Sequence, residues 1–593
     1  MPACRPLCLA LLAVVAAGCT TSVQTERREA AAPTGDARPR ADLANGALAT
    51  QRSMDLAREQ KAEAASISLS EPSAPPAPMA PPAQPLATAA VSLGRMPPAG
   101  PGEAANRENY AAHGVNPVQR TAEAPVSTFS IDVDTGAYSN VRHMLNAGRL
   151  PPADAVRTEE FINYFDYAYT PPRERDIPFS VTTELAPAPW NEQRTLLLVG
   201  VQGFRVDPAD IPAANLVFLI DTSGSMESPD KLDLLKASFK QMLPRLRAQD
   251  RVSIVVYAGS AGLVLPPTPG DQRDTIAAAL DRLQAGGSTN GGAGIELAYA
   301  TAQQAYIPHG VNRVLLATDG DFNVGTVSTE ALKTLVADKR KSGIALTTLG
   351  FGEGNYNDAL AEQLADVGNG NHYYIDTLAE GRKVLQDSLV ATLMTIAKDV
   401  KIQIEFNPAV VEEYRLVGYE NRLLRREDFN NDAVDAGEIG AGHNVTALYE
   451  LTLKGSSGAS DPLRYAPAAL PGRDGELAFL RLRYKQPEGD RSRLIERPIA
   501  RSEIRPAAGE RLRFAAAVAA FADNLRGATH LGDFDLGRIA EVTPGTAERL
   551  VVHVTRPGQD PVSTVPFVLY PVKGDGGRVG YRDTPVPPSE GPR

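Results

Sequence analysis

Short apolar runs recur along the middle of the chain, and amphipathic stretches separate most of them. The runs lie at residues 215–220, 251–257, 313–318, 345–351 and 372–375. Between them, apolar residues return at helical spacing, as Leu232, Leu235 and Phe239 do. This alternation is typical of an α/β fold with a doubly wound, mostly parallel sheet that helices cover on both faces. We expect this domain at residues 214–395, with residues 262–266 as a proline-bounded edge strand.

The segment before this domain has a mixed pattern. Residues 126–133 alternate like a half-buried strand, residues 179–185 and 195–201 are apolar, and residues 138–145 and 158–167 have helical spacing. The pattern predicts a small mixed α/β domain at residues 121–205.

The segment after it alternates with a period of two, as Val400, Ile402 and Ile404 show. Such alternation indicates antiparallel sheet with one solvated face. A helix near residues 511–526 has one apolar side. We expect a C-terminal β-rich domain at residues 398–575, with this helix packed against the sheet.

Residues 1–18 have the pattern of an export signal. The apolar run 9–17 is too short to span a bilayer and follows one positive charge, Arg5. The three small residues directly before Cys19 resemble the lipobox of bacterial lipoproteins, which implies cleavage before Cys19 and acylation of its thiol. Thr20 follows Cys19, and the lack of an Asp at this position resembles lipoproteins that are exported to a Gram-negative outer membrane. A plain signal peptide, with Cys19 incidental, is the alternative.

Residues 19–120 are rich in Ala, Pro and Ser, and their charges balance. The proline-rich run 71–85 favours extended polyproline II. Such a segment cannot bury enough apolar surface to offset the entropy lost on ordering. We expect a disordered tether here and a disordered tail at residues 576–593.

Composition and charge exclude several classes of function. The 593-residue chain is 43% hydrophobic and 22% charged, as in globular proteins. Its net charge of −11 repels a phosphate backbone, so we expect no nucleic-acid partner. All three cysteines lie within the first 19 residues, which excludes thiolate chemistry from the folded part. No G-x-x-x-x-G-K motif is present, and we expect no nucleotide.

Oxygen-bearing side chains gather where the predicted parallel strands end. One strand runs into Asp221-Thr-Ser223-Gly-Ser225, another precedes Asp319, and Thr289 stands in a glycine-rich loop before a helix. Open α/β sheets bind ligands at this edge. Carboxylates and hydroxyls suit a hard divalent cation, with Mg²⁺ favoured and Mn²⁺ and Ca²⁺ left open. Two carboxylates would bring the loaded site close to neutrality, so it could accept another carboxylate.

This set of residues resembles the metal-ion-dependent adhesion site of von Willebrand factor A domains. The resemblance implies that Ser223, Ser225 and Thr289 hold the cation and that Asp221 and Asp319 act directly or through water. It also implies that an acidic side chain of a protein partner takes the open coordination position. Flanking segments are similar to the YfbK-type bacterial lipoproteins, which contain such a domain; they lie at residues 127–139, 159–167, 419–422 and 435–449.

We therefore expect a lipid-anchored protein of a Gram-negative cell envelope, at the outer membrane. It should bind a protein partner that offers an acidic side chain, and it should have no catalytic residues. One alternative is a structural envelope protein that uses the metal only for stability. Another is an envelope hydrolase that uses Asp132 and Asp134. A single Asp-Thr-Gly lacks the second carboxylate of an aspartic protease, and a turn with solvated carboxylates fits this segment better.

Overall fold

The computed structural model describes residues 108–131, 133–173, 176–320, 328–388, 391, 393–434, 436–456, 475–542, 551–552 and 565–566. The expected signal peptide, Cys19 and the tail at residues 576–593 lie outside these ranges. So does the expected tether up to residue 107.

The last part of the expected tether belongs to the folded body. Strand β1 (Gln119–Arg120) pairs with β12 (Val411–Val417), and Asn109 forms a backbone bridge with Asn357. The prediction of disorder is therefore wrong for residues 108–120. Backbone hydrogen bonds hold this polar segment, and a hydropathy pattern does not reveal them.

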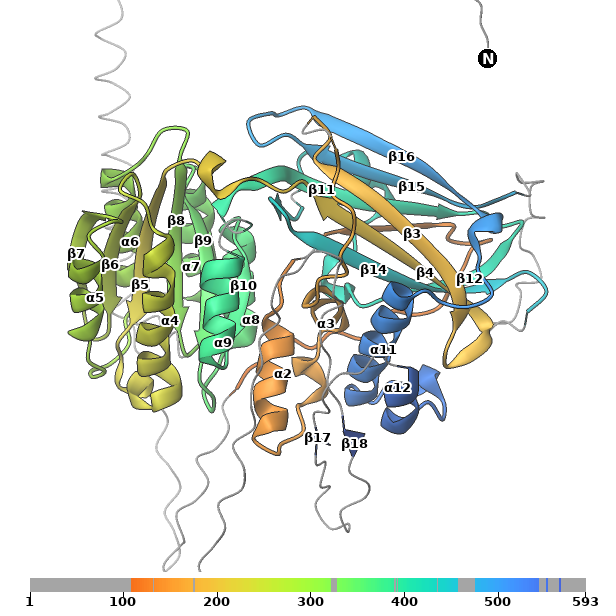
Figure 1. The fold of residues 1–593 in the computed structure, drawn as a ribbon, viewed down its shortest axis with the longest axis horizontal. Coiled ribbons are helices and arrows are strands. Elements are labelled where there is room, and N and C mark those ends of the chain that lie inside the picture. The colour runs from red at the N-terminus through yellow and green to blue at the C-terminus, as the bar shows by residue number, and fades with distance from the viewer. Residues whose placement is uncertain are drawn as a thin grey trace, which may run out of the picture. The chain divides into compact units, whose positions relative to one another are not determined.

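One sheet has six strands in the order β10-β9-β8-β5-β6-β7 (Figure 1). Neighbouring strands are parallel except for the edge strand β7, which is antiparallel to β6. The doubly wound, mostly parallel sheet is confirmed, and so is its edge strand. The strands are β5 (Ala214–Asp221), β6 (Arg251–Tyr257), β7 (Ala261–Pro269), β8 (Val311–Thr318), β9 (Ala345–Phe351) and β10 (His372–Ile375).

Helices cover both faces of this sheet. Phe218 of β5 stacks on Phe239 of α4, with ring centroids 4.2 Å apart. The neighbouring side chains Val217 and Leu219 point the other way and pack in a cluster with Ile295 of α6. The helices of the first face are α4 (Leu234–Met242), α5 (Arg273–Asp281) and α9 (Leu378–Arg382); those of the second are α6 (Gly291–Gln304), α7 (Thr329–Arg340) and α8 (Asp358–Val367).

Two antiparallel sheets form a β-sandwich beside this domain (Figure 1). One has the order β1-β12-β14-β4-β3, and the other has the order β13-β11-β15-β16, with β2 paired to β11. Val199, Tyr449 and Ile404 share the core of the sandwich. The remaining strands are β2 (Val126–Ser130), β3 (Phe179–Ala188), β4 (Asn191–Gly203), β11 (Thr395–Phe406), β13 (Ile439–Gly440), β14 (Asn444–Leu453), β15 (Glu476–Lys485) and β16 (Ser492–Ala500).

The sandwich combines strands that precede the parallel-sheet domain in sequence with strands that follow it. β4 pairs with β14, with Leu197 opposite Tyr449, and β2 pairs with β11. The expected domain at residues 121–205 is therefore not a separate unit. Alternating hydropathy identifies the two faces of a strand, but it does not identify the strand's partner.

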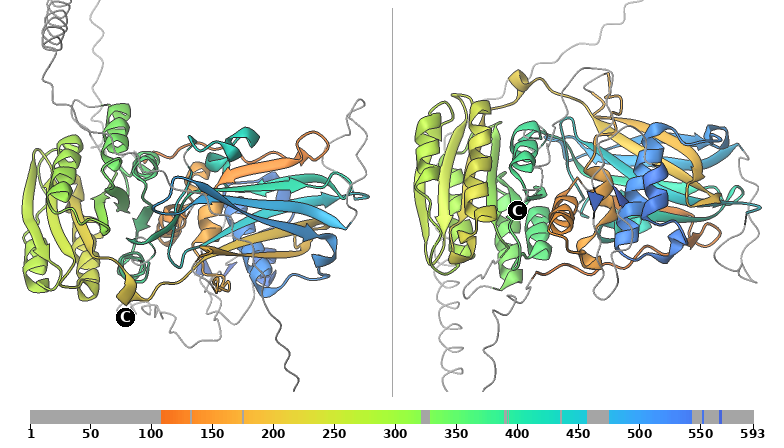
Figure 2. Two further views of the ribbon diagram at one scale, coloured as in Figure 1. Left: turned by 90° about the horizontal axis from the view of Figure 1, so that it is seen from above. Right: turned by 60° about the horizontal axis from the view of Figure 1, so that its bottom comes forward.

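A layer of helices packs on the outer face of the sheet that contains β4 and β14 (Figure 2). Leu196 and Leu198 of β4 share a core cluster with Phe514 and Val518 of α11, so the predicted packing of this helix is confirmed. None of the described helices is long and apolar enough to cross a membrane. The helices of this layer are α3 (Thr158–Asn163), α11 (Glu510–Leu525) and α12 (Leu536–Val542). Helix α2 (Gly136–Asn146) shares their core cluster and also contacts β10 of the parallel sheet. The short strands β17 (Val551–Val552) and β18 (Val565–Pro566) pair with each other.

Candidate metal site

The two carboxylates of the predicted site lie at the same edge of the parallel sheet. Asp221 is the last residue of β5, and Asp319 directly follows β8. The two strands are parallel neighbours, with Ile220 opposite Ala317, so their carboxyl ends meet. Both aspartates are fully buried. The side chain of Thr318 joins the two strand ends by donating a hydrogen bond to Oδ2 of Asp221 over 3.2 Å.

The turn after β5 gathers the first two hydroxyls beside Asp221. The backbone N–H of Ser223 donates to Oδ1 of Asp221 over 2.9 Å. The hydroxyl oxygens of Ser223 and Ser225 lie 2.9 Å apart. Ser223 is buried and Ser225 is half-buried. The Asp-x-Ser-x-Ser spacing thus places three oxygen-bearing side chains in one turn.

The loop with Thr289 is held against this turn by its backbone. The N–H of Gly286 donates to the carbonyl of Thr222 over 2.8 Å, and the N–H of Gly224 donates to the carbonyl of Gly287 over 3.0 Å. Thr289 is half-buried just before α6, which Asn290 caps. The structure therefore places the loops of all five predicted residues at one sheet edge.

Two further residues contact the site, and the sequence analysis did not identify either of them. The ammonium of Lys231 donates to Oδ2 of Asp319 over 3.0 Å and to Oδ1 of Asn355 over 2.9 Å. Nδ2 of Asn355 donates to the same oxygen of Asp319 over 3.1 Å. Lys231 and Asp319 are 88 positions apart in sequence, and no local pattern marks such a contact.

Two glycines permit the close approach of these loops. Gly320 has a φ of +84°, and a Cβ there would lie 2.1 Å from the backbone nitrogen of Asn357. Gly352 has a φ of +68°, and a Cβ there would lie 2.3 Å from Cγ of Lys231. Both positions favour glycine because of the backbone conformation and because of the space available. The first brings the loop after β8 against the start of α8, and the second makes room for the lysine stem.

The environment of Asp221 disfavours its negative charge. Burial raises the pKa of Asp221 to about 6. Hydrogen bonds from Ser223 act in the opposite direction, and the charge of Asp319 adds to the rise. The environment therefore penalises the negative charge of Asp221, and a cation beside it would relieve that penalty.

The donor set fits a hard divalent cation. Ser223, Ser225 and Thr289 could supply hydroxyl oxygens, and Asp221 and Asp319 could supply carboxylates, directly or through water. Oxygen-only sets of this kind suit Mg²⁺, Mn²⁺ or Ca²⁺. Within the described ranges, no cluster of three or more His, Cys, Asp or Glu could hold a metal. A cation here would therefore depend on the hydroxyls.

The alternative hydrolase site has a different environment from the one expected. Asp132 lies outside the described residues. Asp134 is only 3% exposed, so the expectation of solvated carboxylates is wrong for it. Its Oδ1 accepts a hydrogen bond from the backbone N–H of His372 over 2.8 Å, and its Oδ2 lies 3.5 Å from Arg422. These contacts join segments on both sides of the parallel-sheet domain to β10.

Three known families match parts of the chain. The family described as "von Willebrand factor type A domain" matches residues 215–388. The family described as "von Willebrand factor" matches residues 104–198, and that described as "Uncharacterized protein YfbK, C-terminal" matches residues 391–549. The matches thus include both the parallel-sheet domain and the parts around it.

Several individual proteins are similar to this chain. "Uncharacterized protein YfbK" of Escherichia coli (strain K12) is 52% identical over 427 residues, which cover 70% of this chain and 74% of that protein. "Uncharacterized protein sll0103" of Synechocystis sp. is 24% identical over 291 residues, which cover 48% of this chain and 64% of that protein. The solved structure "von Willebrand factor type A from Catenulispora acidiphila" has a TM-score of 0.38 at 17% identity and covers 62% of this chain and 86% of that chain. The chain belongs to the YfbK family and carries a von Willebrand factor type A domain between two flanking parts.

Proposed function

We propose that this protein binds a protein partner through a divalent cation held at the edge of its A domain (residues 215–388). The observation that carries the proposal is the gathering of Asp221, Ser223 and Ser225 in one turn, with Asp319 at the adjacent strand end. An acidic side chain of the partner would complete the coordination of the cation. We take Mg²⁺ as the ion to test first, since hard oxygen ligands suit it, and Mn²⁺ and Ca²⁺ are the alternatives.

The residues of the proposed site have different roles. The backbone N–H of Ser223 and the hydroxyl of Thr318 orient the Asp221 carboxylate. The three hydroxyl residues present neutral oxygen atoms, so only Asp221 and Asp319 compensate the positive charge of the cation. When bound, the cation would supply a Lewis-acidic position that attracts an anionic group.

The proposed activity is binding without catalysis. The site offers oxygen ligands, and Asp134, the described carboxylate of the alternative hydrolase, is hydrogen-bonded inside the protein. Hydrolysis that survives chelation and disappears in Asp134→Asn would contradict this part of the proposal.

We also propose that the protein is a lipoprotein of a Gram-negative outer membrane. Support comes from the sequence alone, through Cys19 and the small residues before it. Stable anchoring by two or more acyl chains would hold the body at the envelope permanently. Cys19→Ser should move the protein from the membrane fraction to the soluble fraction after cell lysis. Unchanged fractionation would contradict the anchor.

Capture of partners from envelope extract tests the binding proposal. The chain is immobilised with Mg²⁺ or with EDTA, and Asp221→Ala is compared with Asp233→Ala. Asp233 is a matched control because it is an exposed aspartate, paired with Lys236, in the same part of the domain. A protein retained only with Mg²⁺, and lost only in Asp221→Ala, would support metal-dependent binding. If the same proteins are retained with Mg²⁺, with EDTA and by Asp221→Ala, the result would favour a purely structural role for the metal.

A further inference from the structure

A buried lysine lies directly on one carboxylate of the candidate metal site. Nζ of Lys231 is 3.0 Å from Oδ2 of Asp319, and the two side chains are 8% and 0% exposed. Buried lysines are rare unless they are paired with an anion. Asn355 contacts both charged groups and completes a triangle of hydrogen bonds.

The backbone around Lys231 is adapted to this contact. Lys231 lies in a π-helical turn, Pro229–Asp233, just ahead of α4. π-Helical turns are rare in proteins, and many of those that occur lie at functional sites. Its stem crosses Gly352, where any Cβ would collide with the Lys231 side chain. Three segments of the A domain therefore converge to hold one ammonium group against Asp319.

We propose that Lys231 is a fixed counter-charge of the metal site, which weakens cation binding and leaves the loaded site positively charged. This inference rests on the proposed metal site and identifies what sets its charge. With the lysine absent, the two negative charges of Asp221 and Asp319 would offset the two positive charges of a dication. With Lys231 in contact with Asp319, the same cation leaves one net positive charge in the site. The sequence-based expectation of a near-neutral loaded site omitted this residue.

Two consequences of opposite sign follow from Coulomb's law. The ammonium repels an incoming cation, so removing its charge should strengthen metal binding. The same ammonium attracts an incoming anion, so removing its charge should weaken anion binding to the loaded protein. A lysine that served only to hold the fold would not produce this opposed pair of changes, because local disorder would weaken both ligands.

The experiment uses Mn²⁺ as the metal probe and acetate as the anion probe. Isothermal titration gives the Mn²⁺ affinity of the wild-type chain, Lys231→Met, Lys231→Arg and Lys240→Met. Solvent-proton relaxation of the Mn²⁺-loaded proteins then reports the displacement of bound water by acetate. Lys240→Met is a matched control, since Lys240 lies on the adjacent helix α4 and pairs with Asp281.

We expect Lys231→Met to bind Mn²⁺ about tenfold more tightly and acetate several-fold more weakly. Lys240→Met should match the wild type for both probes, and Lys231→Arg should retain wild-type behaviour because it keeps the charge. Unchanged or weaker Mn²⁺ binding in Lys231→Met, while the wild type binds the ion, would overturn this inference and leave the metal site itself intact.

A second variant keeps the test decisive where Lys231→Met fails to fold. Asn355→Asp leaves the lysine in place and adds a negative charge beside it, so Mn²⁺ affinity should again rise. A wild-type affinity in Asn355→Asp would contradict electrostatic control of the site. Failure of the wild type to bind Mn²⁺, with no difference from Asp221→Ala, would overturn the proposed site and this inference together.

Discussion

Arg157, in the segment before the A domain, forms an ion pair with Asp358 of α8 inside that domain, and both side chains are almost fully buried. The same guanidinium contacts Glu160 and lies 3.6 Å from Glu362. Burial alone would raise the pKa of Asp358, but Arg157 and His372 outweigh it and hold this pKa below its ordinary value. The segment before the A domain is thus joined to that domain by a buried cluster of charges.

Arg157→Met should destabilise the protein strongly. The substitution removes the cation and leaves Asp358, Glu160 and Glu362 buried with less compensation. Removing one partner of a buried ion pair typically costs about 3–5 kcal/mol. Urea unfolding at neutral pH measures the loss. Lys341→Ala, at the exposed pair with Asp338, is the control and should leave the midpoint unchanged. Equal midpoints for all three proteins would show that the buried cluster contributes little stability.

Local sequence patterns predicted the A domain well, because its strands are buried on both faces and are continuously apolar. The expected strands at residues 251–257 and 345–351 coincide with β6 and β9. The prolines near residues 262–266 indicated the edge strand, which the structure has as β7. The candidate oxygen ligands could be brought together from the sequence for a related reason: they directly follow strands or precede a helix, so their placement depends on local topology.

The same patterns could not predict contacts between distant segments. β16 was missed because of its many charged residues and because Ile499 is its one fully buried residue in the described structure. The pairing of β4 with β14 joins strands on opposite sides of the A domain. Lys231 lies next to apolar positions with helical spacing, and nothing local indicates that its ammonium reaches Asp319. Each of these features depends on the assembled tertiary structure.

Metal removal should leave the protein folded. Asp221 accepts hydrogen bonds from Ser223 and Thr318, and Asp319 is held by Lys231 and Asn355, so the buried carboxylates are satisfied by the protein itself. EDTA should leave the circular dichroism spectrum unchanged. It should lower the melting temperature only by the stabilisation that the bound cation adds. A ligand at 100 times its Kd adds about 2.7 kcal/mol of stability.

Asp221→Ala should abolish this metal-dependent rise in melting temperature, and Asp233→Ala should retain it. Scanning calorimetry with and without Mg²⁺ makes the comparison. Unfolding of the wild type by EDTA would contradict the prediction and identify the metal as a structural requirement.

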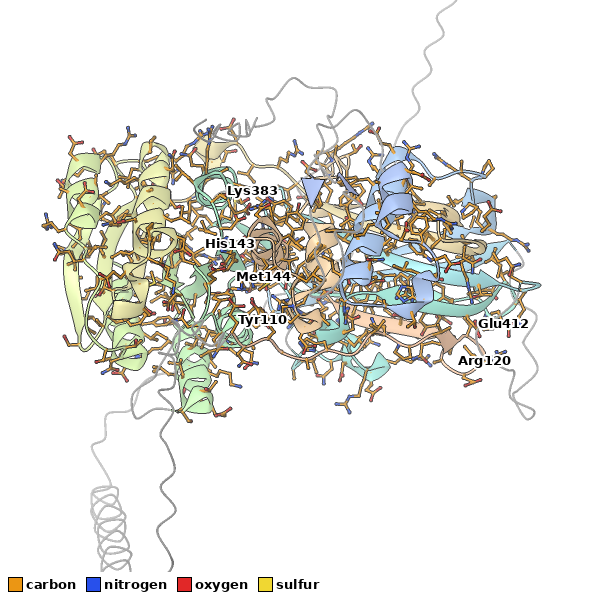
Figure 3. All side chains as sticks on the ribbon, turned by 90° about the horizontal axis from the view of Figure 1, so that it is seen from below. Tyr110, Arg120, His143, Met144, Lys383 and Glu412 are labelled. Atoms are coloured by element: carbon orange, nitrogen blue, oxygen red, sulfur yellow. The ribbon has the colours of Figure 1, made fainter. Side chains whose placement is uncertain are left out.

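Glu108 and Asn109, at the start of the described residues, should restrain the loop at residues 354–356, which lies next to the metal site. Oε1 of Glu108 accepts a hydrogen bond from the backbone N–H of Gly354 over 2.9 Å, and the backbone of Asn109 donates to the carbonyl of Tyr356 over 2.9 Å. The loop between these contacts carries Asn355. Figure 3 labels Tyr110 and His143 in this region, and His143 lies 3.4 Å from Glu353 of the same loop.

Glu108→Ala should therefore increase hydrogen exchange at Gly354 and its neighbours without changing exchange in β5. Local opening depends on the contacts that hold a loop, whereas the buried strand exchanges only through larger openings. Glu123→Ala is the control, since Glu123 pairs with Arg120 elsewhere in the N-terminal segment. Unchanged protection at Gly354 in Glu108→Ala would show that this carboxylate does not restrain the loop.

Acid should destabilise the protein through His443. This residue lies between β13 and β14, and burial lowers its pKa to about 4, with the guanidinium of Arg313 adding to the effect. Its ordinary pKa is about 6.5. Between these pH values His443 is protonated in the unfolded chain but stays neutral in the folded chain. The free energy of unfolding therefore falls as the pH drops from about 6.5 towards 4. The loss should be about 1–2 kcal/mol between pH 7 and pH 5, after allowance for the partial exposure of the residue.

Urea unfolding of the wild type and His443→Gln at pH 7 and pH 5 isolates this contribution. Glutamine does not titrate, so the variant should lose less stability than the wild type over the same interval. The difference between the two proteins removes the effect of carboxyl groups that titrate in the same range, because these groups are common to both. An equal loss in both proteins would mean that His443 is protonated in the folded state as readily as in the unfolded one, and that the positive charge of Arg313 does not oppose it.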